Sequence, residues 1–158
     1  MSEGQQGEPI TAEGLKSLRA EIEDLEGRGR TEMAARIKSA RELGDLKENA
    51  EYHIAKEDQA HLETRIKRLR EKLRHANVVE ADTGSGAFAF GLTAEVFDEA
   101  ADRTHTWTLV GSTEADLAAG RLSAESPVGR ALRDTAVGQT VKIETPRGEK
   151  AYTVRKLV

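Results

Sequence analysis

Cysteine is absent from this chain of 158 residues, and aromatic residues make up only 4% of it. The absence of cysteine excludes disulfides, zinc–cysteine sites, iron–sulfur clusters and thiol catalysis. No apolar stretch approaches the roughly 20 residues that span a bilayer. The first nine residues lack the basic and apolar regions of a secretory signal. We therefore expect a cytoplasmic protein with no membrane partner.

The composition predicts an elongated helical element joined to a small globular domain. Hydrophobic residues account for 37% of the chain and charged residues for 33%, which is too little apolar material for one large core. The net charge of −4 hides a basic middle, because residues 28–75 carry thirteen bases and nine acids. Such a segment fits either a surface that meets phosphate or a solvated helix face with i,i+4 ion pairs, and charge alone favours the second reading.

Two apolar seams with steps of three and four residues predict an antiparallel helical hairpin. The first seam runs from Leu15 to Leu25 and continues to a helix end at Leu43, and the second lies on a helix from Asn49 to His75. The connection between them is so short that the helices can only run antiparallel. Gly27 and Gly29 interrupt the first helix, where we expect a bend or a register shift.

The second half of the chain has the alternating pattern of short strands. Strands are expected around residues 92–96, 106–109, 141–144 and 152–155, with a hairpin turn at Pro146–Gly148 and a helix opened by Ser126 and Pro127. The predicted fold class is α+β, in which a coiled-coil hairpin precedes a small, mostly antiparallel sheet with one helix. The predicted organisation is a flexible tail over 1–10, the hairpin over 11–77 with its tip at 44–49, and the β-rich domain over 78–158. Most of the aromatics are expected in the core of that domain, namely Phe88, Phe90, Phe97, Trp107 and Tyr152.

The turn between the helices is the place where chemistry could reside. Nucleotide-binding, zinc-protease and hydrolase signatures are all missing, and the four histidines do not form a chelating set. Gly44 suits a helix C-terminus, and Asp45 followed by Glu48 resembles a capping box. The same two carboxylates could ligate one magnesium ion together with phosphates supplied by another macromolecule. The pattern leaves both readings open, the cap alone and the cap with metal delivery.

The segment from Ala40 to His53, Ala-Arg-Glu-Leu-Gly-Asp-Leu-Lys-Glu-Asn-Ala-Glu-Tyr-His, closely resembles the signature of bacterial Gre factors of the GreA type. The resemblance continues through residues 126–132 and 137–154. It implies a coiled coil followed by an FKBP-like domain. It also implies a factor that inserts its coiled coil into the secondary channel of bacterial RNA polymerase and stimulates the polymerase's own cleavage of backtracked RNA. Such a factor has no active site or cofactor of its own and shares Mg²⁺ with the polymerase.

The resemblance also implies roles for individual residues. Asp45 and Glu48 would help hold the second magnesium ion and orient a water molecule, and Arg41 and Lys56 would lie near the displaced RNA 3′ segment. The β-rich domain would dock on the channel rim through the region of Ser126 and Pro127. The protein is expected to act as a monomer. A homologue that occupies the same channel and inhibits is the alternative, but such homologues alter the tip acids, which are intact here; a third possibility is a coiled-coil scaffold with a merely capped tip.

Overall fold

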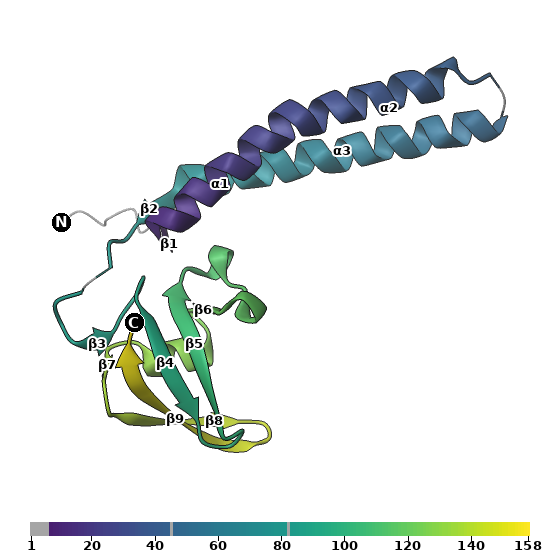
Figure 1. The fold of residues 1–158 in the computed structure, drawn as a ribbon. Helices are drawn as coiled ribbons and strands as arrows, with labels where there is room; N and C mark the ends of the chain where they lie inside the picture. Colours follow the sequence, from purple (N-terminus) through teal and green to yellow (C-terminus); the bar gives the residue numbers. More distant parts are fainter. Residues whose placement is uncertain (1–6, 45, 82) are drawn as a thin grey trace. The chain divides into compact units, whose positions relative to one another are not determined.

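The computed structural model describes residues 7–44, 46–81 and 83–158, with the backbone alone at positions 46–49. The chain divides into two compact units, which are described separately (Figure 1). The helical unit comprises Leu15–His75, and the sheet unit comprises Met1–Gly14 together with Ala76–Val158.

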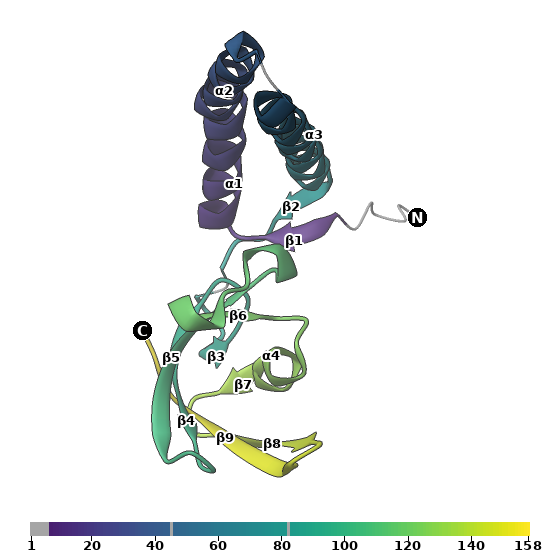
Figure 2. The same ribbon diagram turned by 90° about the vertical axis from the view of Figure 1, so that its right-hand side faces the viewer.

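The helical unit is a hairpin of one interrupted helix and one continuous helix, which lie side by side in Figures 1 and 2. Its elements are α1 (Ala12–Asp24), the π-helical segment η1 (Leu25–Gly29), α2 (Arg30–Glu42) and α3 (Leu46–His75). At about 1.5 Å per residue, α3 is about 45 Å long. The predicted hairpin is thus confirmed, although the first helix ends one residue earlier and the second begins three residues earlier than expected.

The π-helical segment occupies the position of the two glycines and confirms the predicted register shift. A π-helical turn inserts an extra residue between hydrogen-bonded partners, so the face turned towards the second helix changes there. A side chain at Gly27 would meet no atom within 4 Å, whereas one at Gly29 would lie 3.6 Å from Leu62 on α3. The Thr31 hydroxyl donates to the Gly27 carbonyl over 2.9 Å. The irregular turn thus contains two glycines, a residue type of low helix propensity.

A narrow apolar seam and bridging ion pairs hold the two helices of the hairpin together. The buried seam residues on the two sides are Ile22, Ile37, Ala40, Ala55, Ile66 and Leu69. Among the described residues, four arginine–carboxylate pairs cross between the helices, at Arg30–Glu63 (2.9 Å), Arg36–Asp58 (2.7 Å), Arg65–Glu21 and Arg70–Glu26. Because these pairs are largely exposed, water screens each of them, and the seam supplies most of the stability.

The sheet unit contains a five-stranded sheet in the order β6-β5-β4-β9-β8, in which only β5 and β6 run parallel. Its strands are β4 (Thr93–Asp98), β5 (Arg103–Val110), β6 (Arg121–Ser123), β8 (Thr140–Thr145) and β9 (Gly148–Leu157). The smaller elements are β3 (Ala87–Phe88) paired with β7 (Thr135–Ala136), the helix α4 (Pro127–Leu132), and the 3₁₀ turns η2 (Ser112–Glu114) and η3 (Leu117–Ala119). The mostly antiparallel sheet with one α-helix confirms the predicted fold class.

The core of the sheet unit contains most, but not all, of the aromatics that were expected there. Phe88, Trp107 and Tyr152 are buried in it, and Phe90 packs against it. The prediction for Phe97 is wrong, because alternation along β4 buries Ala94, Val96 and Asp98 and places Phe97 on the opposite face. There the Arg155 guanidinium lies 3.9 Å from the centre of the Phe97 ring.

The flexible tail predicted for residues 1–10 requires a correction where the structure describes it. Glu8–Ile10 form a strand, β1, that pairs in parallel with β2 (Ala76–Val78), and Ile10 is only 3% exposed (Figure 2). The carboxylate of Glu114 in η2 accepts hydrogen bonds from the backbone N–H groups of Thr11 and Gly111, both at 3.0 Å, and from the Thr11 hydroxyl. The partners of the first strand, Ala76–Val78 in β2, and the Glu114 partner of Thr11 are distant in sequence. A three-residue strand held in this way could not be recognised from local alternation.

Candidate functional site at the end of the helical hairpin

The far end of the hairpin is the short connection between α2 and α3. Leu43 has an extended backbone and closes α2 by donating its N–H to the Ala40 carbonyl over 3.4 Å. Gly44 does not adopt the left-handed conformation typical of a glycine after a helix, so the helix ends differently from the expected pattern. The connection begins at Leu43, and α3 begins at Leu46.

The two acids predicted to act here are Asp45 and Glu48. Asp45 is outside the described residues, and Glu48 belongs to the first turn of α3 with its side chain outside the description. The predicted capping box and the predicted magnesium ligands therefore stay predictions. Among the described residues, no group of three or more histidines, aspartates and glutamates could hold a metal ion.

Of the two predicted RNA-proximal bases, Arg41 contacts the ring of Tyr52, and Lys56 acts on the same ring through its charge. The Arg41 guanidinium donates to the Tyr52 hydroxyl over 3.4 Å, and its central carbon lies 5.6 Å from the centre of the ring. Lys56 follows Tyr52 by one helical turn and donates to the Gln59 side-chain oxygen over 3.0 Å. We call Arg41, Tyr52 and Lys56 the basic edge of the hairpin. The structure thus brings Arg41 and Lys56 into one electrostatic neighbourhood.

The pKa of Tyr52 is shifted by the positively charged side chains around it. The hydrogen bond from Arg41 lowers the pKa of Tyr52 below its ordinary value of 10.0, and the positive charges of Arg41 and Lys56 act in the same direction. The sequence analysis did not predict Tyr52 as a site residue. The signal that could have found it is an aromatic residue one turn before a lysine and opposite the last arginine of the preceding helix.

The predicted docking residues Ser126 and Pro127 belong to the sheet unit. The Ser126 hydroxyl accepts from the Gly129 N–H over 3.0 Å and donates to the Ser123 carbonyl over 2.7 Å, and Pro127 is the first residue of α4. Ser126 is therefore a helix cap with both hydrogen-bonding functions engaged. The predicted helix start is confirmed, while docking through this region stays a prediction.

Within the described part of the chain, no helix combines the length and the apolar character that a bilayer crossing requires.

Comparison with known proteins identifies the family of the chain. The family model described as "Transcription elongation factor, N-terminal" matches residues 8–78, and that described as "Transcription elongation factor, GreA/GreB, C-term" matches residues 83–157. The transcription elongation factor GreA of Rhodospirillum rubrum is 42% identical over 147 residues, covering 92% of this chain and 94% of that protein. The GreA of Pseudomonas aeruginosa is 40% identical over 148 residues, with the same coverage of both chains.

Among solved structures, the GreA factor homolog 1 (Gfh1) of Thermus thermophilus matches with a TM-score of 0.43 and 25% identity, over 96% of this chain and 99% of that one. The two family models together span almost the whole described chain, and full-length relatives share about two residues in five with it. The resemblance seen at Ala40–His53 is confirmed, and the chain belongs to the GreA/GreB family of transcription elongation factors.

Proposed function

We propose that this chain acts as a monomer in the cytoplasm, binds bacterial RNA polymerase, and inserts its hairpin into the secondary channel to stimulate the polymerase's own cleavage of backtracked RNA. The observation that carries the proposal is that the connection between α2 and α3 lies at the end of a hairpin whose second helix is about 45 Å long. A two-helix rod is narrow enough to enter a channel and long enough to deliver its end to a buried site. The names of the relatives support a role in transcription elongation.

The chemistry of the proposed reaction depends on two carboxylates at the turn. Asp45 and Glu48 are three residues apart, a spacing that places two side chains near each other at a helix start. Oxygen donors of this type suit magnesium, which takes one or two carboxylates in addition to phosphates and water. When bound between these residues and the polymerase site, such an ion would activate water and stabilise the phosphoryl oxygens. The carboxylates themselves would orient that water.

The basic edge would position the RNA. Arg41 and Lys56 carry long cationic side chains, and the pKa of Tyr52 is lowered by its hydrogen bond from Arg41 and by the positive charges of both bases. A guanidinium can bind a phosphate with two parallel hydrogen bonds, whereas an ammonium acts as a point charge. Both would hold phosphates of the displaced 3′ segment. The region of Ser126 and Pro127 would dock the sheet unit on the rim of the channel.

A transcript-cleavage assay on stalled elongation complexes tests this function. The variants Asp45→Asn and Glu48→Gln should still bind polymerase, while stimulation of cleavage falls by about 100-fold or more, since charge stabilisation at a reacting phosphate is lost. Glu57→Gln is the matched control, because Glu57 is an exposed carboxylate farther along α3 whose nearest base is His61, at 3.8 Å.

Each alternative has its own result in this assay. Unchanged cleavage in the double variant would refute metal delivery. Loss of polymerase binding in the double variant would make the tip a docking element. A wild-type protein that binds polymerase and suppresses cleavage would be an inhibitor.

A further inference from the structure

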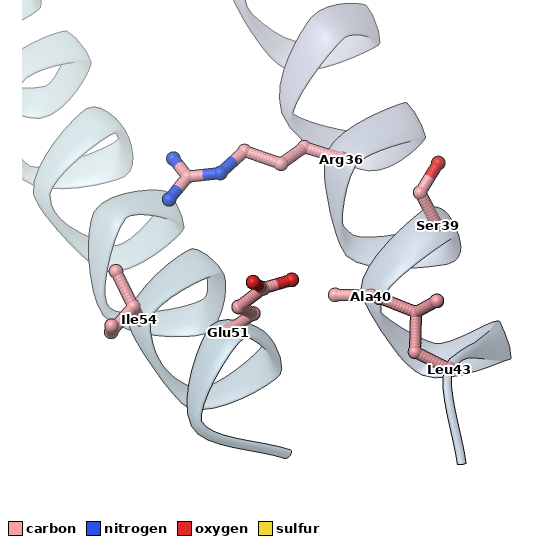
Figure 3. Close-up of a pocket in the computed structure, with 6 residues that line it drawn as sticks. All are labelled: Arg36, Ser39, Ala40, Leu43, Glu51 and Ile54. Carbon is pink, nitrogen blue, oxygen red and sulfur yellow. The ribbon is translucent and has the colours of Figure 1, made fainter. Parts of the chain in front are cut away.

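A groove lies between α2 and α3 close to the end of the hairpin (Figure 3). Its volume is about 460 Å³. Both helices and the residue that caps α2 contribute to its lining, which consists of Arg36, Ser39, Ala40, Leu43, Glu51 and Ile54. We call these residues the tip groove.

The tip groove exposes apolar surface that the fold of the hairpin does not use. Leu43 is 42% exposed and Ile54 is 52% exposed, and they are the only large apolar side chains of the helical unit that are exposed among the described residues. The hairpin seam uses the neighbouring Ala55, which is completely buried, so Ile54 is not required for packing of the helices. Exposed apolar surface in a concave site marks a place where another molecule can be bound.

The charges around the groove indicate what kind of molecule fits. The Arg36 guanidinium is engaged by the Asp58 carboxylate at 2.7 Å, which neutralises it. Within the described part of the chain, no base forms an ion pair with Glu51, whose carboxylate lines the same groove. An apolar groove whose carboxylate pairs with no described base disfavours a phosphate backbone. It favours a protein segment with a bulky apolar side chain next to a lysine or arginine.

The groove and the basic edge face in different directions. Ile54 follows Tyr52 by two residues, which corresponds to about 200° of rotation around α3. Residues with this spacing do not share a helix face. A hairpin enclosed by a channel could therefore hold RNA on the flank of Arg41, Tyr52 and Lys56 while its other flank contacts protein.

We propose that the tip groove is a docking site for a segment of RNA polymerase that presents a bulky apolar side chain beside a lysine or arginine. This inference rests on the proposed function, because it assumes that the hairpin enters the polymerase. The apolar side chain would cover Leu43 and Ile54, and the base would pair with Glu51. The groove would thereby set the rotation of the hairpin about its own axis and turn the basic edge towards the RNA.

The affinity for polymerase tests the groove. The double variant Leu43→Ser/Ile54→Ser should bind about 10-fold more weakly, which corresponds to about 1.4 kcal/mol. Glu51→Lys should bind about 3-fold to 10-fold more weakly, because it opposes the base of the partner. Ala60→Ser is the matched control, since Ala60 is exposed on the same helix outside the groove, and its affinity should be unchanged. Circular dichroism should show equal helix content in all variants.

A photocrosslinker identifies what occupies the groove. Benzoylphenylalanine in place of Ile54 should form adducts with a polymerase subunit, at a peptide that contains a bulky apolar residue beside a base. Adducts with RNA would overturn this inference alone. So would an unchanged affinity of the double serine variant, provided that the wild-type protein binds polymerase. Failure of the wild-type protein to bind polymerase would overturn the proposed function as well.

Discussion

Replacing Gly129 by alanine tests how the sheet unit is assembled around α4. Gly129 lies inside this helix and is buried, and its backbone needs no positive φ. A Cβ atom there would lie 1.8 Å from the Ser123 carbonyl oxygen and 3.0 Å from the Ala124 Cα. Both neighbours are backbone atoms, so rotation of a side chain cannot relieve the overlap. The helix and the chain that precedes it must move apart.

The expected loss can be worked out from these contacts. In an unobstructed helix, alanine is favoured over glycine by about 1 kcal/mol. Overpacking against backbone typically costs about 1–3 kcal/mol. Displacing Ser123 also weakens the cap, because the Ser123 carbonyl accepts from the Ser126 hydroxyl and from its N–H; a lost cap costs about 1 kcal/mol. We expect a net destabilisation of about 1–3 kcal/mol, which lowers the melting temperature of a unit of this size by about 5–20 °C.

Thermal unfolding followed by tryptophan fluorescence provides the assay, because Trp107, the one tryptophan of the chain, lies in the core of the sheet unit. Gly27→Ala is the matched control, since a Cβ at Gly27 meets nothing within 4 Å. It should leave the fluorescence transition unchanged and raise the transition of the helical hairpin, followed by circular dichroism. A fluorescence transition of Gly129→Ala within a few degrees of the wild-type value would refute the steric argument.

Two further predictions concern charges on the hairpin. The hydrogen bond from Arg30 lowers the pKa of Glu63 below its ordinary value of 4.5, so the stability that it contributes is complete above about pH 4.5 and is lost as the pH falls through the lowered value. The wild-type hairpin should therefore melt higher than Glu63→Gln at pH 7, with the difference vanishing as the pH falls through the lowered pKa of Glu63. A difference independent of pH would contradict the assignment. Arg41→Ala should raise the pKa of Tyr52 and leave Tyr152, whose pKa burial raises, unchanged. Tyrosine absorbance during a pH titration measures both, and an unchanged titration would show that Arg41 does not act on the ring.

The helical hairpin and the main strands could be predicted from the sequence because their signals are local. The seams around Ile22 and Ile66 repeat with the helical period, and alternation identified the strands that bury Val96 and Val154. Phe97 was misplaced because alternation shows that two faces exist, but one aromatic residue is not enough to show which face carries the core. The strand Glu8–Ile10 was missed because its partner is almost seventy residues away.

Some residues of the candidate site were predicted from the sequence, but their arrangement was not. The resemblance around the turn pointed to Arg41 and Lys56, and the structure adds that Arg41 donates a hydrogen bond to Tyr52 and that this bond and the charges of both bases lower its pKa. The tip groove could not be foreseen, since Leu43 ends one helix and Ile54 lies on the next, and each looks like an ordinary apolar residue in its own segment.

The sequence by itself determined the family, the hairpin, the strands and the acids at the turn, because periodicity and a contiguous signature are properties of neighbouring residues. Only the tertiary structure decided the pairing of β1 with β2, the environment of Tyr52 and the existence of a groove between α2 and α3. Each of these depends on which distant segments come within a few ångströms of one another, and that is settled by packing of the whole chain.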